Sequence, residues 1–433
     1  MAVTVVRNQQ IPVVGKYDVV VVGGGPAGFI AATAAGRCGA SVALVERYGY
    51  LGGMATAGTV APISEYMHEG ELIVGGIPLE FAETLEKMGA GTMCKPRGNF
   101  TCHPEYYKLV AQRMVLDAGV KLYYHSFLSG CGVEDGKITH IIMETKEGSM
   151  ALEANYFIDA TGDGDLAYMA GVPMQDHGEN LQPMTLCFTL DKVKCDMIPG
   201  YYPGDKGSSL RHVAAKLNEI RKTEQIPLSG GPWCVAGLGD GYAFVNMSRT
   251  SGDYTKVEDA TAAECTLREN VHTLHQLLKE NFEEFTDSTI ISTAQQVGIR
   301  ETRHIKGVHI LTGDEYVRGE FFPDTIARCS HPIDIHSAKD NQQRVSHLKE
   351  AAYLPYRSII AENFPNLLVP SRCFSADREA FASARVQAGV MGLGQAAGVA
   401  AAQCNADGRS VKDADIEKLR ATLISWGAYI EKK

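Results

Sequence analysis

The sequence predicts an α/β fold in which a domain built on a parallel sheet is interrupted by a second domain of mixed α and β structure. Three observations predict it. A short apolar strand at residues 17–22 runs directly into a glycine-rich turn and the start of a helix. An alanine-rich stretch at 29–38 suits a crossover helix, and the apolar run at 41–46 suits a second buried strand. Residues from about 182 to 335 change character, with mixed strands and a polar helix near 260–281.

The turn after the first strand has the sequence of a dinucleotide-binding site. Gly23 permits a tight turn, Gly25 lacks the Cβ that would block a pyrophosphate, and Gly28 lets the helix pack close to the strand. Pro26 and Ala27 fall in the first helical turn, where a missing amide donor costs little and the helix dipole favours an anion. We therefore expect a diphosphate to bind at this helix N-terminus.

Glu46 ends the second strand about 20 residues beyond the first glycine, the spacing at which an acidic residue binds ribose hydroxyls in such sites. We expect Glu46, with Arg47 beside it, to contact the nucleotide. The alternative is a plain βαβ unit whose Glu46 faces solvent. In the loop that follows, Gly52 and Gly53 permit a very close approach of the backbone to a flat group.

The remaining segments return the chain to the first sheet. A helix is expected from 104 to about 118, strands at 120–127, 138–145, 149–152 and 155–160, a strand at 366–370 and a buried helix at about 386–402. Neither domain is therefore continuous in sequence. We expect residues 15–65, 100–180 and 340–433 to form the nucleotide-binding domain, and residues 66–99 and 181–339 to form the substrate domain.

Composition excludes several classes of protein. The chain has 433 residues, of which 45% are hydrophobic and 21% charged, as in ordinary globular proteins. Its net charge of −10 and the lack of a dense basic tract argue against nucleic acid or an acidic membrane as a partner. The residues before the first strand lack a signal-peptide pattern, and the apolar stretch at 386–402 is too short to span a membrane. We expect a cytoplasmic protein.

The cysteines also carry information. There are eleven, scattered without a C-x-x-C pair or a Cys/His cluster. Such cysteines are typical of reduced thiols in a cytoplasmic protein and predict no metal site.

Further motifs stand in order along the chain, at residues 21–28, 45–58, 158–165, 297–303, 332–336, 354–358, 366–373 and 392–398. Together they resemble the bacterial FAD-dependent oxidoreductases of the glutathione-reductase-like flavoprotein superfamily, over nearly the whole chain. The resemblance implies a Rossmann-like FAD-binding domain with an inserted mixed α+β substrate or cap domain. It also implies a non-covalent FAD, because the loop at 51–58 contains no histidine.

The resemblance also implies roles for individual residues. Gly23, Gly25 and Gly28 would hold the FAD diphosphate, with Pro26 and Ala27 between them, and Glu46 would hold the adenosine ribose. Gly52, Gly53 and Met54 would lie along the ribityl and isoalloxazine groups, Asp163 beside the diphosphate, and Arg372 and Cys373 beside the ribityl chain. The helix after Arg385 would direct its positive end toward the flavin N1–C2 edge, and the alternative for Arg385 is a surface ion pair.

The chain departs from the superfamily pattern in three respects. Ser371 and Arg372 stand where many members have Gly-Asp, so the usual carboxylate contact to the ribityl chain is in doubt. A second nucleotide fingerprint is missing, and so is a C-x-x-x-x-C redox pair. These absences argue against an NAD(P)H domain of the disulfide-reductase type.

The substrate domain must supply an acid/base and anchoring groups beside the flavin. If 333–336 is a strand, Asp334 and His336 share a face, and the carboxylate orients the imidazole. We expect His336 to be the acid/base, and the alternative is a purely structural Asp–His pair. Arg300 and Arg357 are expected to anchor a carboxylate or other electron-rich group, unless they are interdomain ion-pair residues.

Three further side chains complete these expectations. Tyr356 would donate to a substrate oxygen, and the alternative is a buried tyrosine that donates to a local carbonyl. Glu301 and Arg303 fall on the opposite face from Arg300 in an extended segment and are expected to be structural.

The sequence thus predicts an enzyme that transfers a hydride between flavin N5 and a small polar organic substrate, as a dehydrogenase or reductase. Two alternatives stay open, a flavin monooxygenase and a flavin-bearing electron-transfer subunit of a complex. The expected partners are a small-molecule substrate and an unidentified electron donor or acceptor, without nucleic acid or a membrane span. A homo-oligomer is compatible with the sequence.

Overall fold

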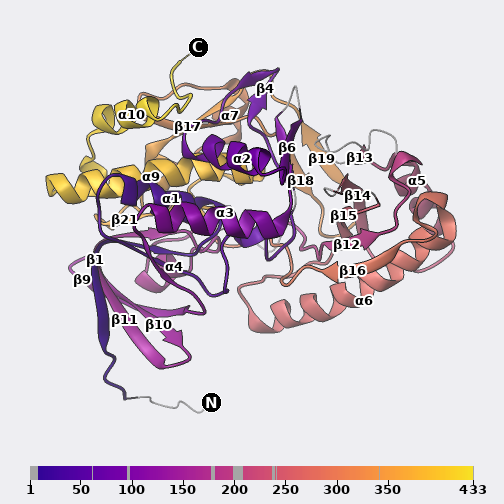
Figure 1. The fold of residues 1–433 in the computed structure, drawn as a ribbon, viewed down its shortest axis with the longest axis horizontal. Coiled ribbons are helices and arrows are strands. Elements are labelled where there is room, and N and C mark those ends of the chain that lie inside the picture. The colour runs from indigo at the N-terminus through magenta and orange to yellow at the C-terminus, as the bar shows by residue number, and fades with distance from the viewer. Residues whose placement is uncertain are drawn as a thin grey trace.

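The structure is a computed structural model that describes residues 8–60, 62–94, 98–176, 181–197, 208–236, 239, 241–340 and 342–432. Figure 1 shows two lobes, one with helix α6 (Val257–Asn281) at the right of the view and one with helices α1 (Pro26–Arg37) and α9 (Gln387–Asp407) at the left. No helix in the described residues is long and apolar enough to cross a membrane.

A seven-stranded mixed sheet forms the framework of the left-hand lobe. Its order is β8-β2-β1-β11-β10-β9, with β21 paired to β11. The strands are β1 Val13–Val22, β2 Val42–Val45, β8 Lys121–Tyr123, β9 Phe127–Glu134, β10 Lys137–Thr145, β11 Gly148–Asp159 and β21 Leu367–Leu368. β1 is parallel to both β2 and β11, whereas β10 pairs antiparallel with β11 on one side and with β9 on the other. This arrangement confirms the predicted α/β class.

The expected strands at 149–152 and 155–160 are a single strand, β11. Its first half pairs with β10 while the strand as a whole pairs with β1, from Val13 opposite Ala151 to Val22 opposite Asp159. β1 pairs with β11 on both sides of residues 153–154, and β10 pairs with it up to Glu153, so the strand continues there without a break.

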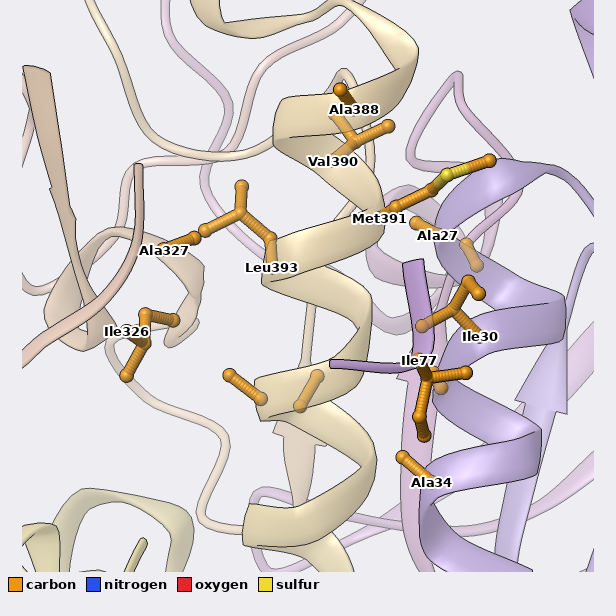
Figure 2. Close-up of a cluster of buried hydrophobic side chains, with 14 of the residues drawn as sticks. Ala27, Ile30, Ala34, Ile77, Ile326, Ala327, Ala388, Val390, Met391 and Leu393 are labelled. Atoms are coloured by element: carbon orange, nitrogen blue, oxygen red, sulfur yellow. The ribbon is translucent and has the colours of Figure 1, made fainter. Parts of the chain in front are cut away.

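Helices α1 and α9 cross in close contact over this sheet. A Cβ on Gly394 would lie 2.2 Å from the carbonyl oxygen of Ala27, and one on Gly398 would lie 2.2 Å from that of Ala31. Only glycine allows the two backbones to approach so closely. Figure 2 shows α9 running between α1 and the strand that carries Ile326 and Ala327. As predicted, the segment at 386–402 is a buried helix.

Other elements of this lobe pack around the same core. The helices are α2 Ile77–Lys87, α3 Pro104–Asp117, α4 Asp165–Ala170, α7 Gly313–Arg318, α8 Arg378–Ala384 and α10 Ile416–Ser425. The short helical turns are η1 Gly53–Ala55, η4 Tyr356–Ile359 and η5 Val411–Asp413. The small strands are β3 Pro62–Ile63, β4 Met67–His68, β5 Glu71–Leu72, β6 Gly91–Cys94, β7 Asn99–Cys102, β17 Thr325–Cys329 and β20 Ala352–Pro355.

A second sheet forms the other lobe, with strand order β13-β14-β15-β12-β16. Its elements are β12 Phe188–Asp191, η2 Cys195–Met197, β13 Ser208–Ser209, α5 Arg211–Ile220, β14 Ser229–Ala236, β15 Ala243–Ser248, α6, η3 Glu283–Phe285 and β16 Thr289–Thr293. A separate hairpin, β18 Ile333–His336 with β19 Gln343–Ser346, lies beside it in Figure 1. The sequence predicts an inserted domain of mixed α and β structure, and the structure shows that its sheets are antiparallel.

The cores indicate where the lobes divide. Buried residues between Met184 and Val297 form one hydrophobic cluster. Tyr66 and Phe81, expected in the substrate domain, belong instead to the cluster that contains α1, as do Tyr316 and Phe322. We therefore propose that the substrate domain is centred on residues 184–297 and that the segment at 66–99 packs with the nucleotide-binding domain.

Candidate active site

A cavity of about 870 Å³ extends from the glycine turn after β1 to the antiparallel sheet of the second lobe. Its lining includes the first turn of α9, the turn at 160–165, strand β15 and hairpin β18–β19. One continuous cavity is therefore shared by both lobes.

The glycine turn has the geometry that the sequence predicts. Gly23 has a φ of +95°, a conformation that favours glycine. A Cβ on Gly28 would lie 1.8 Å from the carbonyl oxygen of Gly23, so this glycine allows helix and strand to pack together. Gly25, by contrast, faces open space in the cavity, where the nearest atom to an added Cβ is Gly53 Cα at 3.8 Å.

The N-terminus of α1 forms the floor of this open space. Gly25 is its N-cap, no side chain caps the helix, and no acidic residue stands in its first turn. Pro26 and Ala27 also line the cavity. The helix dipole and amide groups there present a positive end that an anionic group such as a diphosphate would neutralise.

Glu46 is buried at the edge of the cavity and accepts two hydrogen bonds from backbone amides. Its Oε2 accepts from the Gly24 amide at 2.7 Å, and its Oε1 accepts from the Tyr48 amide at 2.9 Å. Burial raises the pKa of Glu46, although the amide donors favour its charged form. The carboxylate therefore holds the turn and the following loop in place, and it does not face bulk solvent.

Arg47 and Tyr48 connect the nucleotide-binding lobe to the other lobe through Gln296. Both side chains donate to Gln296 Oε1, and all three residues line the cavity. The Nε2 of Gln296 is buried and has no acceptor in the described part of the chain. Nothing in the sequence around Gln296 signals this position, since the contact joins segments about 250 residues apart.

The loop at residues 52–54 contributes Gly53 and Met54 to the cavity lining, whereas Gly52 lies behind them. Gly52 has a φ of +113°, and its amide donates to the Gly24 carbonyl at 2.8 Å. It thus shapes the loop.

Asp163 joins the turn after β11 to two distant segments. It accepts a hydrogen bond from the Thr302 hydroxyl at 2.7 Å and forms an ion pair with Arg372. Burial raises its pKa, but the Arg372 guanidinium and the Thr302 hydroxyl outweigh burial and hold the pKa of Asp163 below its usual range. Asp163 and Arg372 line the cavity as a charged pair.

The neighbouring residues Cys373 and Arg303 have structural contacts. Cys373 is buried outside the cavity lining, with its Sγ 3.0 Å from Ser371 Oγ, so its side chain packs behind the loop. Arg303 forms an ion pair with Asp165 at 2.8 Å, and Glu301 accepts from the Gln182 amide at 3.0 Å, as expected of structural side chains.

Arg385 lies at the cavity just before α9. Its Nε is buried without an acceptor among the described residues. Burial lowers the pKa of Arg385 to about 10. No described carboxylate forms an ion pair with Arg385, so the described residues do not show the alternative of a surface ion pair. The N-cap of α9, Val386, has no side chain that caps the helix, so the positive end of α9 also faces the cavity.

Asp334 and His336 share a face of β18, as predicted, with Asp334 Oδ2 2.9 Å from His336 Nε2. The Nδ1 of His336 lies 2.9 Å from Arg249 Nη2. Because arginine only donates, Nδ1 must accept, and Nε2 must carry the proton given to Asp334. Burial, followed by the charge of Arg300, lowers the pKa of His336, so the imidazole is neutral.

The assignment of His336 as acid/base therefore needs correction. Both ring nitrogens already have partners, and the ring resists a second proton. We assign it a positioning role instead, in which it connects Arg249 to Asp334. The sequence predicts the Asp–His pair but contains no signal for Arg249, which follows β15 and lies 87 positions from His336.

Arg300 lies at the cavity on the side of the antiparallel sheet. Its Nη1 donates to the Pro183 carbonyl at 2.8 Å and to Thr185 Oγ1 at 2.6 Å, and its Nη2 reaches Asn246 Oδ1 at 3.5 Å. Burial lowers the pKa of Arg300 to about 10. The segment at 298–304 is not a regular strand, since only Gly298 in it forms a β-bridge.

The structure contradicts the predicted contacts of Tyr356 and Arg357 with a substrate. Both fall in η4, which turns them away from the cavity. The Tyr356 hydroxyl donates to the Val411 carbonyl at 2.9 Å, and Arg357 forms an ion pair with Asp324 at 3.0 Å. Tyr356 therefore donates to a carbonyl of the protein and Arg357 forms an ion pair, so neither contacts the cavity.

Glu65 and Asn99 are two polar side chains of the cavity that the sequence does not predict. Glu65 is buried and accepts from Ser330 Oγ at 3.3 Å. Asn99 is 8% exposed, and its Oδ1 has no donor within the described residues. Neither stands in a recognisable motif, so only the fold identifies them.

The cavity fits an extended dinucleotide. The open space at Gly25 and the positive end of α1 suit a diphosphate, and the positive end of α9 suits the electron-rich edge of a planar ring. The unpartnered donors on Gln296 and Arg385 lie along the same cavity.

Comparisons with known proteins agree with this description. A family model described as FAD dependent oxidoreductase matches residues 18–423. Dihydrolipoyl dehydrogenase 3 of Pseudomonas putida is 31% identical over 153 residues, which cover 34% of this chain and 31% of that protein. The match thus spans about a third of the length of this curated relative.

Two solved structures resemble the whole chain. One is a geranylgeranyl bacteriochlorophyll reductase-like protein from Thermoplasma acidophilum, with a TM-score of 0.51, 14% identity and coverage of 95% of this chain and 84% of that one. The other is a flavoprotein/dehydrogenase from Cytophaga hutchinsonii, with a TM-score of 0.48, 14% identity and coverage of 96% and 86%. Since the family model covers most of its length, this chain belongs to the FAD-dependent oxidoreductase family, and the family implies FAD as its cofactor.

Proposed function

We propose that this enzyme transfers a hydride between N5 of non-covalently bound FAD and a small polar organic substrate. The observation that carries the proposal is the continuous cavity, lined by the glycine turn at one end and by polar side chains of the second lobe at the other. When bound, FAD supplies a ring that accepts or donates two electrons together with a proton.

The nucleotide half of the cofactor would be held by the first lobe. Gly23, Gly25, Pro26 and Ala27 present the N-terminus of α1 to the diphosphate. Glu46 supports the ribose side, and Arg47 closes the cavity through Gln296.

The ring half would lie between the loop at 52–54 and the start of α9. Arg385 and the α9 dipole place positive charge there, which favours a ring that has gained electrons. Arg372 and Asp163 form an ion pair on the cavity lining and would flank the middle of the cofactor as a neutral pair.

The residues of the second lobe would bind and orient the substrate, with Arg300 as anchor and the Asp334–His336–Arg249 chain holding the polar wall rigid. We assign proton exchange with the substrate to Glu65, a buried carboxyl group of the cavity. Asp334 is unsuited because its two oxygens already accept hydrogen bonds from His336 Nε2 and Gln343 Nε2.

The test begins with purified holoprotein mixed anaerobically with small alcohols, amines and organic acids. Bleaching of the visible flavin band by one class supports hydride transfer from substrate. In the reverse direction, photoreduced enzyme is mixed with unsaturated organic acceptors, and return of the band shows reductase activity. Acid denaturation should release the flavin from the protein. A yellow precipitate would contradict non-covalent binding.

Two other results would contradict the proposal. Oxygen-dependent hydroxylation of the substrate would indicate a flavin monooxygenase. Reduction by a protein partner alone, with no turnover of any isolated organic compound, would indicate an electron-transfer subunit. The same holoprotein would be used to identify the electron donor or acceptor. It would also be used to determine whether the chain forms a homo-oligomer.

A further inference from the structure

We propose that the substrate is a small organic acid whose carboxylate binds at Arg300 and Arg385. This inference rests on the proposed function, because it names the class of molecule that would occupy the substrate end of the cavity. It differs from the sequence-based expectation, in which Arg357 was the partner of Arg300.

Arg300 has the contacts of an anchoring residue. Its three hydrogen-bond acceptors among the described residues, on Pro183, Thr185 and Asn246, are neutral. No carboxylate in the described residues lies within ion-pair distance of Arg300, although the residue lines the cavity. The neutral acceptors fix the guanidinium in place and leave its charge uncompensated.

Arg385 approaches the same end of the cavity from the other lobe. Arg385 is partly buried. Among the described residues no carboxylate forms an ion pair with it, and its buried Nε has no acceptor. The charge of Arg300 lowers the pKa of Arg385 and of His336, and the charge of Arg385 lowers the pKa of Asp334. These four groups therefore form one electrostatic cluster. The unused donor indicates a missing acceptor.

The carboxylates around this cluster already have hydrogen-bond donors. Asp334 accepts from His336 and from Gln343 Nε2 at 2.6 Å, and Glu301 accepts from the Gln182 amide. Asp340 acts on Arg249 and is not a lining residue of the cavity. Arg300 and Arg385 are partly buried and form no ion pair with a described carboxylate, and a bound carboxylate would supply that partner.

The surroundings describe the rest of the ligand. Trp233 and Phe244 line the cavity beside Asn246, and they suit an apolar body attached to the carboxylate. Arg211 and His347, both exposed, stand on the cavity lining as well. Basic side chains at an entrance would attract an anion, even though the whole chain carries a net charge of −10.

The test measures binding to the oxidised holoprotein without turnover. Benzoate and its neutral isostere benzamide are titrated separately, and binding is followed by the flavin difference spectrum and by equilibrium dialysis. We expect benzoate to bind at least tenfold more tightly than benzamide. Equal binding of the two compounds would overturn the proposal, and so would binding of inorganic phosphate in place of benzoate.

Variants locate the site. Arg300→Gln should weaken benzoate binding at least tenfold while FAD occupancy is retained, and Arg385→Gln should weaken it as well. Arg300→Lys keeps the charge without the planar fork, so its affinity for benzoate should lie between those of the wild type and Arg300→Gln. This variant tests the anchor if Arg300→Gln folds poorly. Arg357→Gln, an arginine outside the cavity, is the matched control and should leave binding unchanged. Wild-type binding in Arg300→Gln would refute the anchor.

The outcomes separate this inference from the proposed function. Tight benzoate binding without flavin reduction by any organic compound would support the anion site and contradict the hydride-transfer proposal. Flavin reduction by a neutral substrate, in a protein that does not discriminate benzoate from benzamide, would contradict the anion site and leave the proposed function standing.

Discussion

The Nη2 of Arg249 lies 2.9 Å from the Nδ1 of His336, and this contact determines the protonation state of the imidazole. A protonated ring would present an N–H to the guanidinium and lose the hydrogen bond. Asp334 accepts at the other nitrogen, so the neutral ring satisfies both neighbours. The relationship makes His336 part of the wall that positions Asp334.

This arrangement predicts how the stability of the protein depends on pH. Burial and Arg300 lower the pKa of His336 in the folded state, while the unfolded residue titrates near its ordinary value. Below about pH 6.5 the unfolded chain gains a proton that the folded chain does not, so stability falls as the pH falls. His336→Gln should remove this contribution, about 1.4 kcal/mol per pH unit at most, and flatten the dependence. Thermal unfolding between about pH 7 and about pH 5 measures it. Parallel curves for the two proteins would show that His336 accepts a proton in the fold.

The glycine turn predicts opposite outcomes for two alanine substitutions. Gly28→Ala places a Cβ 1.8 Å from the Gly23 carbonyl oxygen and should destabilise the apoprotein by about 2 kcal/mol or more. Gly25→Ala meets nothing closer than 3.8 Å and has a φ of −69°, so the apoprotein should be unchanged or about 0.5 kcal/mol more stable.

The cofactor distinguishes the same two variants further. Gly25→Ala should weaken FAD binding at least tenfold, because its methyl group enters the space assigned to the diphosphate. Urea unfolding of the apoproteins and fluorescence titration with FAD measure both quantities. Wild-type FAD affinity in a stable Gly25→Ala protein would place the diphosphate elsewhere.

Substitution of aspartate by asparagine should cost more folding stability at Asp163 than at Asp165. Asp163 pairs with Arg372 where both side chains are little exposed, at 11% and 13%, so Asp163→Asn should cost about 3 kcal/mol. Asp165 pairs with Arg303, and its side chain is 37% exposed, so Asp165→Asn should cost about 1 kcal/mol or less. Urea unfolding of both variants gives the comparison. Equal losses would show that the Asp163–Arg372 pair does not connect its segments more strongly than the exposed pair.

The parts of this site that the sequence predicts are those in which local spacing determines position. The glycine turn, α1 and Glu46 lie within a single βαβ unit, so strand and helix periodicity place them together. Asp334 and His336 are two apart on one strand, and alternation alone puts them on one face. These contacts need no knowledge of the rest of the chain.

The parts that it does not predict depend on contacts between distant segments. Gln296 meets Arg47 through the packing of one lobe against the other, and Arg249 meets His336 where the end of β15 lies beside hairpin β18–β19. Tyr356 follows a strand directly, but the chain turns into η4 there and directs it toward Val411. Local pattern contains no information about that turn, because the carbonyl that accepts the Tyr356 hydrogen bond lies 55 positions further along the chain.

Tyr356 and Arg357 give a prediction of unchanged catalysis. Tyr356→Phe removes one buried hydrogen bond and should cost about 1 kcal/mol of stability. Arg357→Gln removes a partly exposed ion pair and should cost about 1 kcal/mol or less. Neither should change the rate of flavin reduction once a substrate is known, which stopped-flow absorbance measures. A tenfold slower reduction in either folded variant would return that residue to the active site.

Replacing Arg385 by glutamine should not lower the stability of the apoprotein, but it should lower the reduction potential of the flavin. Burial lowers its pKa to about 10, so keeping the guanidinium charged in the apoprotein costs on the order of 3 kcal/mol. Arg385→Gln should therefore leave the apoprotein as stable as the wild type or more stable. In the holoprotein the same change removes a cation at the start of α9, where electron density would increase on reduction, and should lower the flavin potential. Dye equilibration measures the potential and thermal unfolding the stability, with Arg385→Lys expected to fall between glutamine and wild type in both. A less stable apoprotein with an unchanged potential would mean that Arg385 holds the fold together and does not act on the ring.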